Sequence, residues 1–277
     1  TDLDRVAPYA KLMKHKRLGG CGDWEMDGAS GSHSAAFAEA YTDTGKTAPC
    51  YYDQETVDRL CAEAEAQGYQ IASHAIGDLA IKRLVDAYEK MGSTKLHRIE
   101  HAEFADDETF RRICEGNYAI LAQPGYSWID KRYLHTYEQF LPKEICDRLK
   151  LKKLYDAGIC LCGSSDSPCQ DMDPYQQMLG MVQYYNEEES ITPYEAMVTY
   201  TRTPARALEE GDEFGTLEAG KAADFFTADR DFFRLTPMEV AAFRPLRTYY
   251  GGIPYVKKKG TVTELIKMML KKPRQIR

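Results

Sequence analysis

Short apolar runs that alternate with helix-like segments are the feature that most constrains the fold of this 277-residue chain. The strand-like runs lie at 20–28, 69–73, 96–102, 118–123 and 159–163. Apolar side chains recur at helical spacing in the other segments, which lie at 56–67, 80–91, 107–115, 143–157 and 193–208. Strands that alternate with helices over this length predict right-handed crossover units and a parallel sheet.

Three polar residues stand at or just beyond the ends of these runs: His74, His101 and Asp166. In a barrel of strand–helix units, the carboxyl ends of the strands and the loops after them build the active site. His74 and His101 are one such unit apart, and the interval from His101 to Asp166 leaves room for two units with a long loop. Two imidazoles and a carboxylate suit zinc, which activates a bound water. The pattern therefore predicts a metal-dependent hydrolase.

Each of these residues also has an alternative interpretation. A single histidine on a strand is more often a hydrogen-bonded core residue than a metal ligand. The segment 163–168 could be merely a polar turn whose bend is set by Pro168. The three residues together, all at the same expected edge of the sheet, favour the metal site over these separate structural roles.

Composition narrows the classes of function. The formal net charge is −7, and binding to nucleic acid depends on clustered Lys and Arg, so no nucleic-acid partner is expected. The basic stretch from Lys257 to Arg277 is interpreted as a solvated tail. The eight cysteines include no Cys-x-x-Cys pair, which favours a reducing cytoplasm over a disulfide framework. No apolar run approaches the roughly 20 residues of a membrane span, and the first residues are too polar for a signal peptide.

Six segments, in their order along the chain, resemble the metal-dependent amidohydrolase superfamily. The resemblance is closest to the branch called amidohydrolase family 3 and covers nearly the whole chain. The segments are Asp27–Ala35, His74–Asp78, His97–Ala102, Gln123-Pro124, Gly163–Asp166 and Gly215–Asp224.

The resemblance implies an α/β fold of the (β/α)8 TIM-barrel type, with one or two divalent metals that are often zinc. The chain would begin about three strands into that barrel, so that residues 1–210 hold strands four to eight. Residues 211–277 would form a returning part of a small β-sandwich and the basic tail, with a hairpin that turns at Gly251-Gly252. By position, His74 and His101 match metal ligands after strands five and six. Asp166 matches the aspartate after strand eight that binds metal and transfers the proton.

Two departures from the family pattern limit these expectations. The His-x-His that ends the first barrel strand in the family is missing from this chain. The chain also starts at Thr1 rather than Met, so it is interpreted either as a fragment or as a subunit that needs an N-terminal half or a partner. The position of the family's bridging lysine holds Asp23. Asp23 and Glu25 have the same strand parity, and either carboxylate could be a further metal ligand or a solvated charge.

Candidate substrate contacts come from the aromatic-rich segment 125–137, which is placed to cover the site. They are Tyr126, Trp128 and Arg132, although such aromatic residues are also common in packing. Residues that could orient the ligand histidines, or pair with Arg98, are Asp78, Glu100 and Gln123.

The sequence therefore predicts hydrolysis of a small molecule at a carbon–nitrogen bond other than a peptide bond, in an amide, cyclic amide or N-acyl group. The alternative is a catalytically incomplete fragment or subunit that associates with itself or with a partner chain.

Overall fold

The computed structural model describes residues 2–132 and 135–256. Its main sheet contains five parallel strands in the order β1-β2-β3-β4-β5. The strands are β1 (Arg17–Glu25), β2 (Gln70–Ala75), β3 (His97–His101), β4 (Tyr118–Ala122) and β5 (Cys160–Gly163). All five come from the apolar runs that predicted them, and the predicted parallel α/β sheet is confirmed.

The two faces of this sheet differ in chemistry because successive strand residues point to opposite sides. On one face, Ile71, Ile99, Ile120 and Leu161 are completely buried in the main hydrophobic core. On the other face, one row of paired positions contains His74, Glu100, Leu121 and Cys162. The polar side chains thus gather on the face away from the main core.

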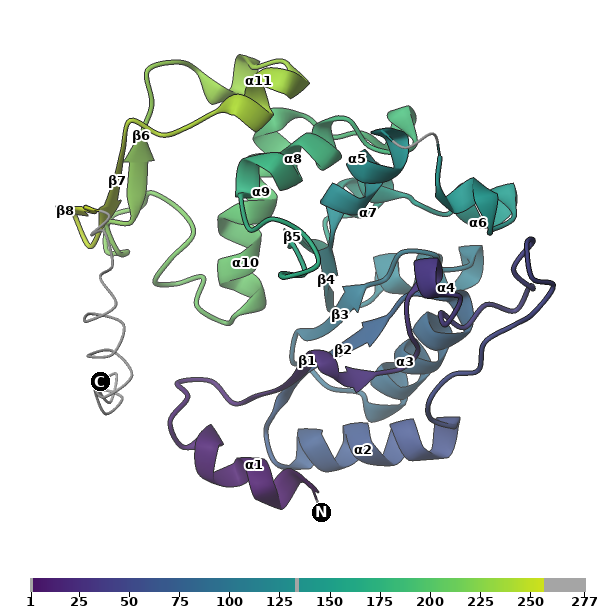
Figure 1. Ribbon diagram of the computed structural model, residues 1–277. Coiled ribbons are helices and arrows are strands. Elements are labelled where there is room, and N and C mark those ends of the chain that lie inside the picture. The colour runs from purple at the N-terminus through teal and green to yellow at the C-terminus, as the bar shows by residue number, and fades with distance from the viewer. Residues whose placement is uncertain (1, 133–134, 257–277) are drawn as a thin grey trace, which may run out of the picture.

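Helices connect the strands and cover the apolar face. In Figure 1 the helices α2, α3 and α4 lie together on one side of the strands. Asp53 caps the first of them, accepting a hydrogen bond from the Thr56 backbone N–H at 2.9 Å. The helices before β5 are α1 (Asp2–Ala10), α2 (Gln54–Ala66), α3 (Asp78–Met91), α4 (Asp107–Glu115), α5 (Pro124–Arg132), α6 (Lys143–Cys146) and α7 (Leu151–Asp156).

Two long predicted helices are each broken in the structure. The segment 143–157 divides into α6 and α7 because Lys150 leaves the helical region, with φ −116° and ψ 58°. The segment 193–208 divides at Thr201 into α9 (Pro193–Tyr200) and α10 (Arg202–Ala207). Apolar periodicity continues across both breaks, which is why the sequence predicted single helices. The substrate-contact segment predicted at 125–137 mostly forms α5.

The remaining described chain returns beside the helices of the parallel sheet. It contains α8 (Pro174–Val182), α11 (Pro237–Ala242), and the strands β6 (Phe225–Thr227), β7 (Arg247–Tyr250) and β8 (Ile253–Pro254). These strands form one antiparallel sheet. The predicted hairpin turn at Gly251-Gly252 is confirmed, with φ of 56° and 75°. The expected sandwich is thus represented by a single three-stranded sheet, and the predicted basic tail lies outside the described residues.

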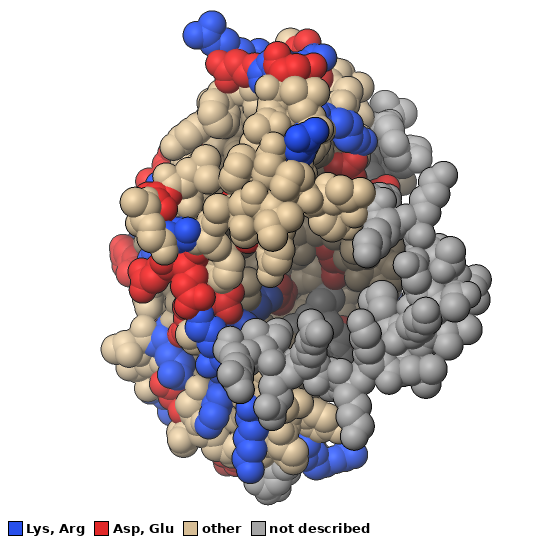
Figure 2. All heavy atoms as spheres, turned by 90° about the vertical axis from the view of Figure 1, so that its left-hand side faces the viewer, with Lys and Arg blue, Asp and Glu red and all other residues tan. Residues whose placement is uncertain are grey.

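One face of this small sheet is apolar and exposed. Figure 1 places β6, β7 and β8 apart from the parallel strands, and Figure 2 shows a broad uncharged area between bands of charged residues on that side of the molecule. Leu246, Tyr250 and Ile253 remain at least 65% exposed. Among the helices of the described ranges, none has the length and apolar character that crossing a membrane requires.

Candidate metal centre

The carboxyl ends of the parallel strands bring most of the predicted site residues to one cavity of about 540 Å³. Glu25 ends β1 and lies in register with His74 on β2. His101 ends β3, and Asp166 follows β5 by three residues. All four residues line the cavity, together with Tyr126 from α5. A cavity of this size suits a small-molecule ligand.

The other predicted residues are not placed there. Trp128 lies half-buried on α5 and does not line the cavity, while Arg132 is the last residue of that helix. Asp23 is part of β1, and its side chain is outside the described part of the structure, as is that of Arg132.

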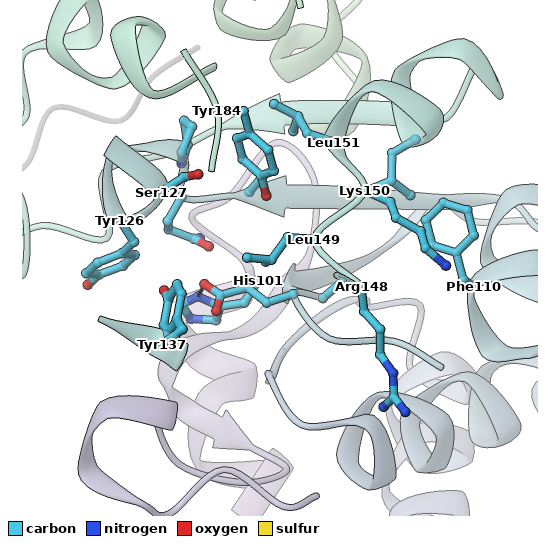
Figure 3. A pocket seen from close by; sticks show the side chains of 16 residues that line it. His101, Phe110, Tyr126, Ser127, Tyr137, Arg148, Leu149, Lys150, Leu151 and Tyr184 are labelled. Atoms are coloured by element: carbon cyan, nitrogen blue, oxygen red, sulfur yellow. Dashed lines mark ion pairs between the residues drawn. The ribbon is translucent and has the colours of Figure 1, made fainter. Parts of the chain in front are cut away.

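The two histidines form a buried pair. Their ring centroids are 4.4 Å apart at an interplanar angle of 71°, and each residue is about 95% buried. By strict strand alternation His101 would face the helices with Ile99, but the alternation ends at His101, whose φ of 73° is left-handed. Figure 3 shows His101 at the centre of its cavity, next to Tyr137.

The chemical state of His101 suits a metal ligand. Burial lowers the pKa of His101 to about 4, and the neighbouring His74 adds to this effect, whereas Asp166 and a hydrogen bond with Gln123 oppose it. The imidazole is therefore neutral near pH 7, which is the form that coordinates metals. Gln123 thus contacts the histidine that the sequence expected it to orient.

Asp166 is held in a strained turn. Its φ is 52°, a left-handed conformation that a residue with a side chain seldom adopts. Its Oδ2 accepts a hydrogen bond from the Tyr126 hydroxyl at 3.2 Å, and its backbone N–H lies 3.3 Å from Ser164 Oγ. Gly163 precedes this turn because a Cβ there would lie 2.1 Å from the Tyr200 ring.

Asp27 is a structural residue of the site to which sequence reasoning gave no role. Its carboxylate accepts hydrogen bonds from the backbone N–H groups of Ala36, Ile76 and Gly77, at 2.8, 3.0 and 2.8 Å. His74 Nε2 lies 3.6 Å from Asp27 Oδ1. Burial raises the pKa of Asp27, although these hydrogen bonds and His74 act against the increase. Asp27 thereby ties the loop after β1 to the end of β2.

Glu103 is a second residue that sequence reasoning missed. It lies two positions beyond His101 and lines the cavity. Burial raises the pKa of Glu103 to about 8, and the carboxylates of Asp27 and Asp166 raise it further. The only sequence signal was an acidic residue close to a predicted ligand in an otherwise apolar segment.

The remaining candidate orienting residues have other partners. Arg98 donates to Glu100 Oε1 through Nε at 3.0 Å and through a terminal nitrogen at 2.7 Å, which is one of its two predicted pairings. Asp78 accepts hydrogen bonds from Ala38 N at 2.9 Å and from Arg148 at 2.8 Å. Asp78 therefore joins the loop after β1 to the segment before α7.

The residue types around the cavity fit a divalent metal, because they combine buried imidazoles, one of them neutral, with carboxylates. In the described ranges, however, no three His, Cys, Asp or Glu side chains converge closely enough to hold an ion as they stand. Binding would require His74, His101 and a carboxylate to move closer together.

A family model described as "Amidohydrolase family" matches residues 15–256. The chain belongs to this amidohydrolase family. YtcJ of Bacillus subtilis, provisionally named an amidohydrolase, is 30% identical over 248 residues, which cover 82% of this chain and 45% of YtcJ. The N-substituted formamide deformylase of Arthrobacter pascens is 29% identical, over 73% of this chain and 39% of its own length.

The fold of this amidohydrolase is also similar to solved structures. An uncharacterised metal-dependent hydrolase of Pyrococcus furiosus superposes with a TM-score of 0.71 and 26% identity, over 84% of this chain and 49% of that one. The chain thus spans less than half the length of the two curated relatives and about half of this solved structure.

Proposed function

We propose that this amidohydrolase is a metal-dependent hydrolase of carbon–nitrogen bonds other than peptide bonds, acting on an amide, cyclic amide or N-acyl group of a small molecule. The observation that carries the proposal is that His74, His101, Asp166 and Glu25 line one cavity at the carboxyl edge of a parallel sheet. Two similarities support it: one relative is named as a deformylase of N-substituted formamides, and one solved neighbour as a metal-dependent hydrolase.

His74 and His101 would hold a divalent ion, for which zinc suits the ligand types best. Asp166 and Glu25 would complete the site, with Asp23 as the alternative to Glu25, and the number of ions would be one or two. A bound zinc ion supplies Lewis acidity to a carbonyl and lowers the pKa of water towards 7.

The proton transfers would belong to the protein. Asp166 would accept the proton of the attacking water and pass it to the leaving nitrogen, as a general base and then a general acid. The hydroxyl of Tyr126, 3.2 Å from Oδ2, would hold that carboxylate in place. Gln123 would fix the ring of His101. Tyr126, Trp128 and Arg132 remain our candidates for substrate contacts.

A second candidate function follows from the sheet edges. Within the described ranges, β1 and β5 each pair with only one neighbouring strand, so both edges of the parallel sheet can accept another strand. The alternative is therefore that catalysis needs further barrel strands, supplied by an N-terminal half, a second copy or a partner chain. We further propose a boundary between the barrel part and the sandwich part at residues 210 and 211, and a cytoplasmic location.

Metal content and amine release from a panel of N-formyl and cyclic amides, measured on the full-length protein, test the first proposal. We expect His74→Ala and His101→Ala to lose the metal, and Asp166→Asn to lower kcat by about 10²–10⁴-fold, the usual contribution of acid–base catalysis. His15→Ala is the control, because His15 does not line the cavity. A protein without bound divalent ion, with hydrolysis unchanged by Asp166→Asn, would refute the proposal.

Light scattering beside the activity assay separates the two candidates. Full activity in a monodisperse monomer excludes the incomplete form. Activity that appears only on self-association, or on adding a partner chain, supports it.

A further inference from the structure

The charges that line the proposed substrate cavity are strongly one-sided. Three carboxyl groups line it, from Glu25, Glu103 and Asp166. Among the described residues that line it, none is a lysine or an arginine. A substrate with a carboxylate would therefore find no described cationic side chain in this cavity.

A second, smaller cavity of about 30 Å³ adjoins the first and shares His101, Glu103, Tyr126 and Tyr137 with it. Arg148 and Lys150 line this smaller cavity. The side chains of both residues are turned away from His101 and Tyr137, as Figure 3 shows.

These two cations are already engaged elsewhere. The Arg148 guanidinium donates to Asp78 at 2.8 Å. The Lys150 ammonium pairs with Asp107 and lies 5.0 Å from the centre of the Phe110 ring. Their charges are therefore not available to neutralise Glu103.

Glu103 itself is an unusual lining residue. Only 12% of its side chain is exposed, and its carboxylate accepts no hydrogen bond from the described residues. The nearest group that can carry a positive charge is His101 Nδ1, 3.9 Å from Glu103 Oε1. Burying a carboxylate without a partner is costly, and a cationic partner offsets that cost.

Resting on the proposed function above, we propose that Glu103 is a specificity-determining residue that receives a positively charged nitrogen of the substrate. The preferred substrates would be amides that also carry an amine or an amidine, rather than neutral amides or amides with a carboxylate. A charge-assisted hydrogen bond to Glu103 would supply the preference.

Three probes of similar shape test this proposal: N-formylbenzylamine, its 4-aminomethyl derivative and its 4-carboxy derivative. Their dissociation constants are measured by calorimetry on the full-length, zinc-loaded protein carrying Asp166→Asn, which prevents turnover. The cationic probe should bind about 10–100-fold more tightly than the neutral probe, as a hydrogen bond to a charged group allows. The anionic probe should bind more weakly than both.

The substitution Glu103→Gln keeps the shape of the side chain and removes its charge. We expect it to reduce the preference for the cationic probe to less than threefold, with affinity for the neutral probe almost unchanged. In the protein with Asp166 intact, the same variant should raise KM for the cationic probe more than it lowers kcat. Glu39→Gln, at an exposed residue outside the cavity, is the matched control.

The outcomes separate this proposal from the proposed function. Equal binding of the cationic and neutral probes, or tighter binding of the anionic probe, overturns the role of Glu103 and leaves the hydrolase intact. The expected order of binding without hydrolysis of any carbon–nitrogen substrate supports Glu103 as a cation-binding residue and counts against the hydrolase. If Glu103→Gln does not fold, the probe series on the protein with Glu103 intact still decides the charge preference.

Discussion

The hydroxyl of Tyr126 donates to Oδ2 of Asp166 across 3.2 Å, so a residue predicted from its aromatic surroundings to contact substrate also holds the proposed proton carrier. The two residues come from different units of the fold, α5 and the turn after β5. Their contact therefore depends on how these units pack.

We expect Tyr126→Phe to lower kcat by about tenfold, because a hydrogen bond to a charged group contributes about 1.5–3 kcal/mol. Steady-state kinetics with a cleaved substrate measure the effect, and metal content should stay constant. Tyr175→Phe, which removes a hydroxyl outside the cavity, serves as the control. An unchanged kcat in Tyr126→Phe would show that the contact has no part in catalysis.

The register of β1 on β2 sets Glu25 beside His74, which makes Glu25 the better candidate for a further metal ligand. Residues that only support a ligand typically contribute about 10–100-fold to metal affinity. We therefore expect Glu25→Gln to weaken zinc binding by at least about tenfold and Asp23→Asn to have a smaller effect. Competition with a chromogenic chelator measures both, and the reverse order would assign the role to Asp23.

Asp27→Asn should destabilise the fold. The amide group presents one oxygen where the carboxylate presents two, so one of the three buried backbone N–H groups loses its acceptor. The expected loss is about 2 kcal/mol in the free energy of unfolding, the usual penalty for an unsatisfied buried donor. Urea denaturation measures it, with the exposed Asp212→Asn as control. Equal stability of the two variants would argue against this structural role.

The pKa of Glu103 predicts a dependence of stability on pH in the metal-free protein. Its ordinary pKa is 4.5 and its folded value is about 8, so the folded state favours the protonated form. The stability that this group contributes is full below pH 4.5 and is lost as the pH rises to about 8.

The variant Glu103→Gln lacks this loss. Its unfolding free energy relative to the original protein should therefore increase between pH 5 and pH 8, by about 2 kcal/mol after allowing for solvent around a partly accessible group. Urea denaturation in EDTA at the two pH values gives the difference, and Glu39→Gln should show none. A difference that stays constant with pH contradicts the buried, raised-pKa state of Glu103.

Local patterns were enough to predict the five strands and the residues at their ends, because both depend on short-range periodicity. The breaks at Lys150 and Thr201 were not predictable in that way, since the apolar spacing continues across them and only tertiary packing decides where the helix stops. Asp27 and Glu103 were missed for a related reason. Their partners and their burial come from loops that are distant in sequence, and no spacing rule reports such contacts.

The order of the strands has a consequence for how such a site can arise and change. Each strand of the parallel sheet pairs only with the strands before and after it along the chain. The interval between His74 and His101 is therefore fixed within a single strand–helix–strand repeat, independent of what lies at the outer strands. An insertion or exchange of whole repeats at β1 or β5 would leave this histidine pair intact while changing its carboxylate neighbours. Such a modular arrangement lets metal preference and substrate range diverge without rebuilding the core of the site.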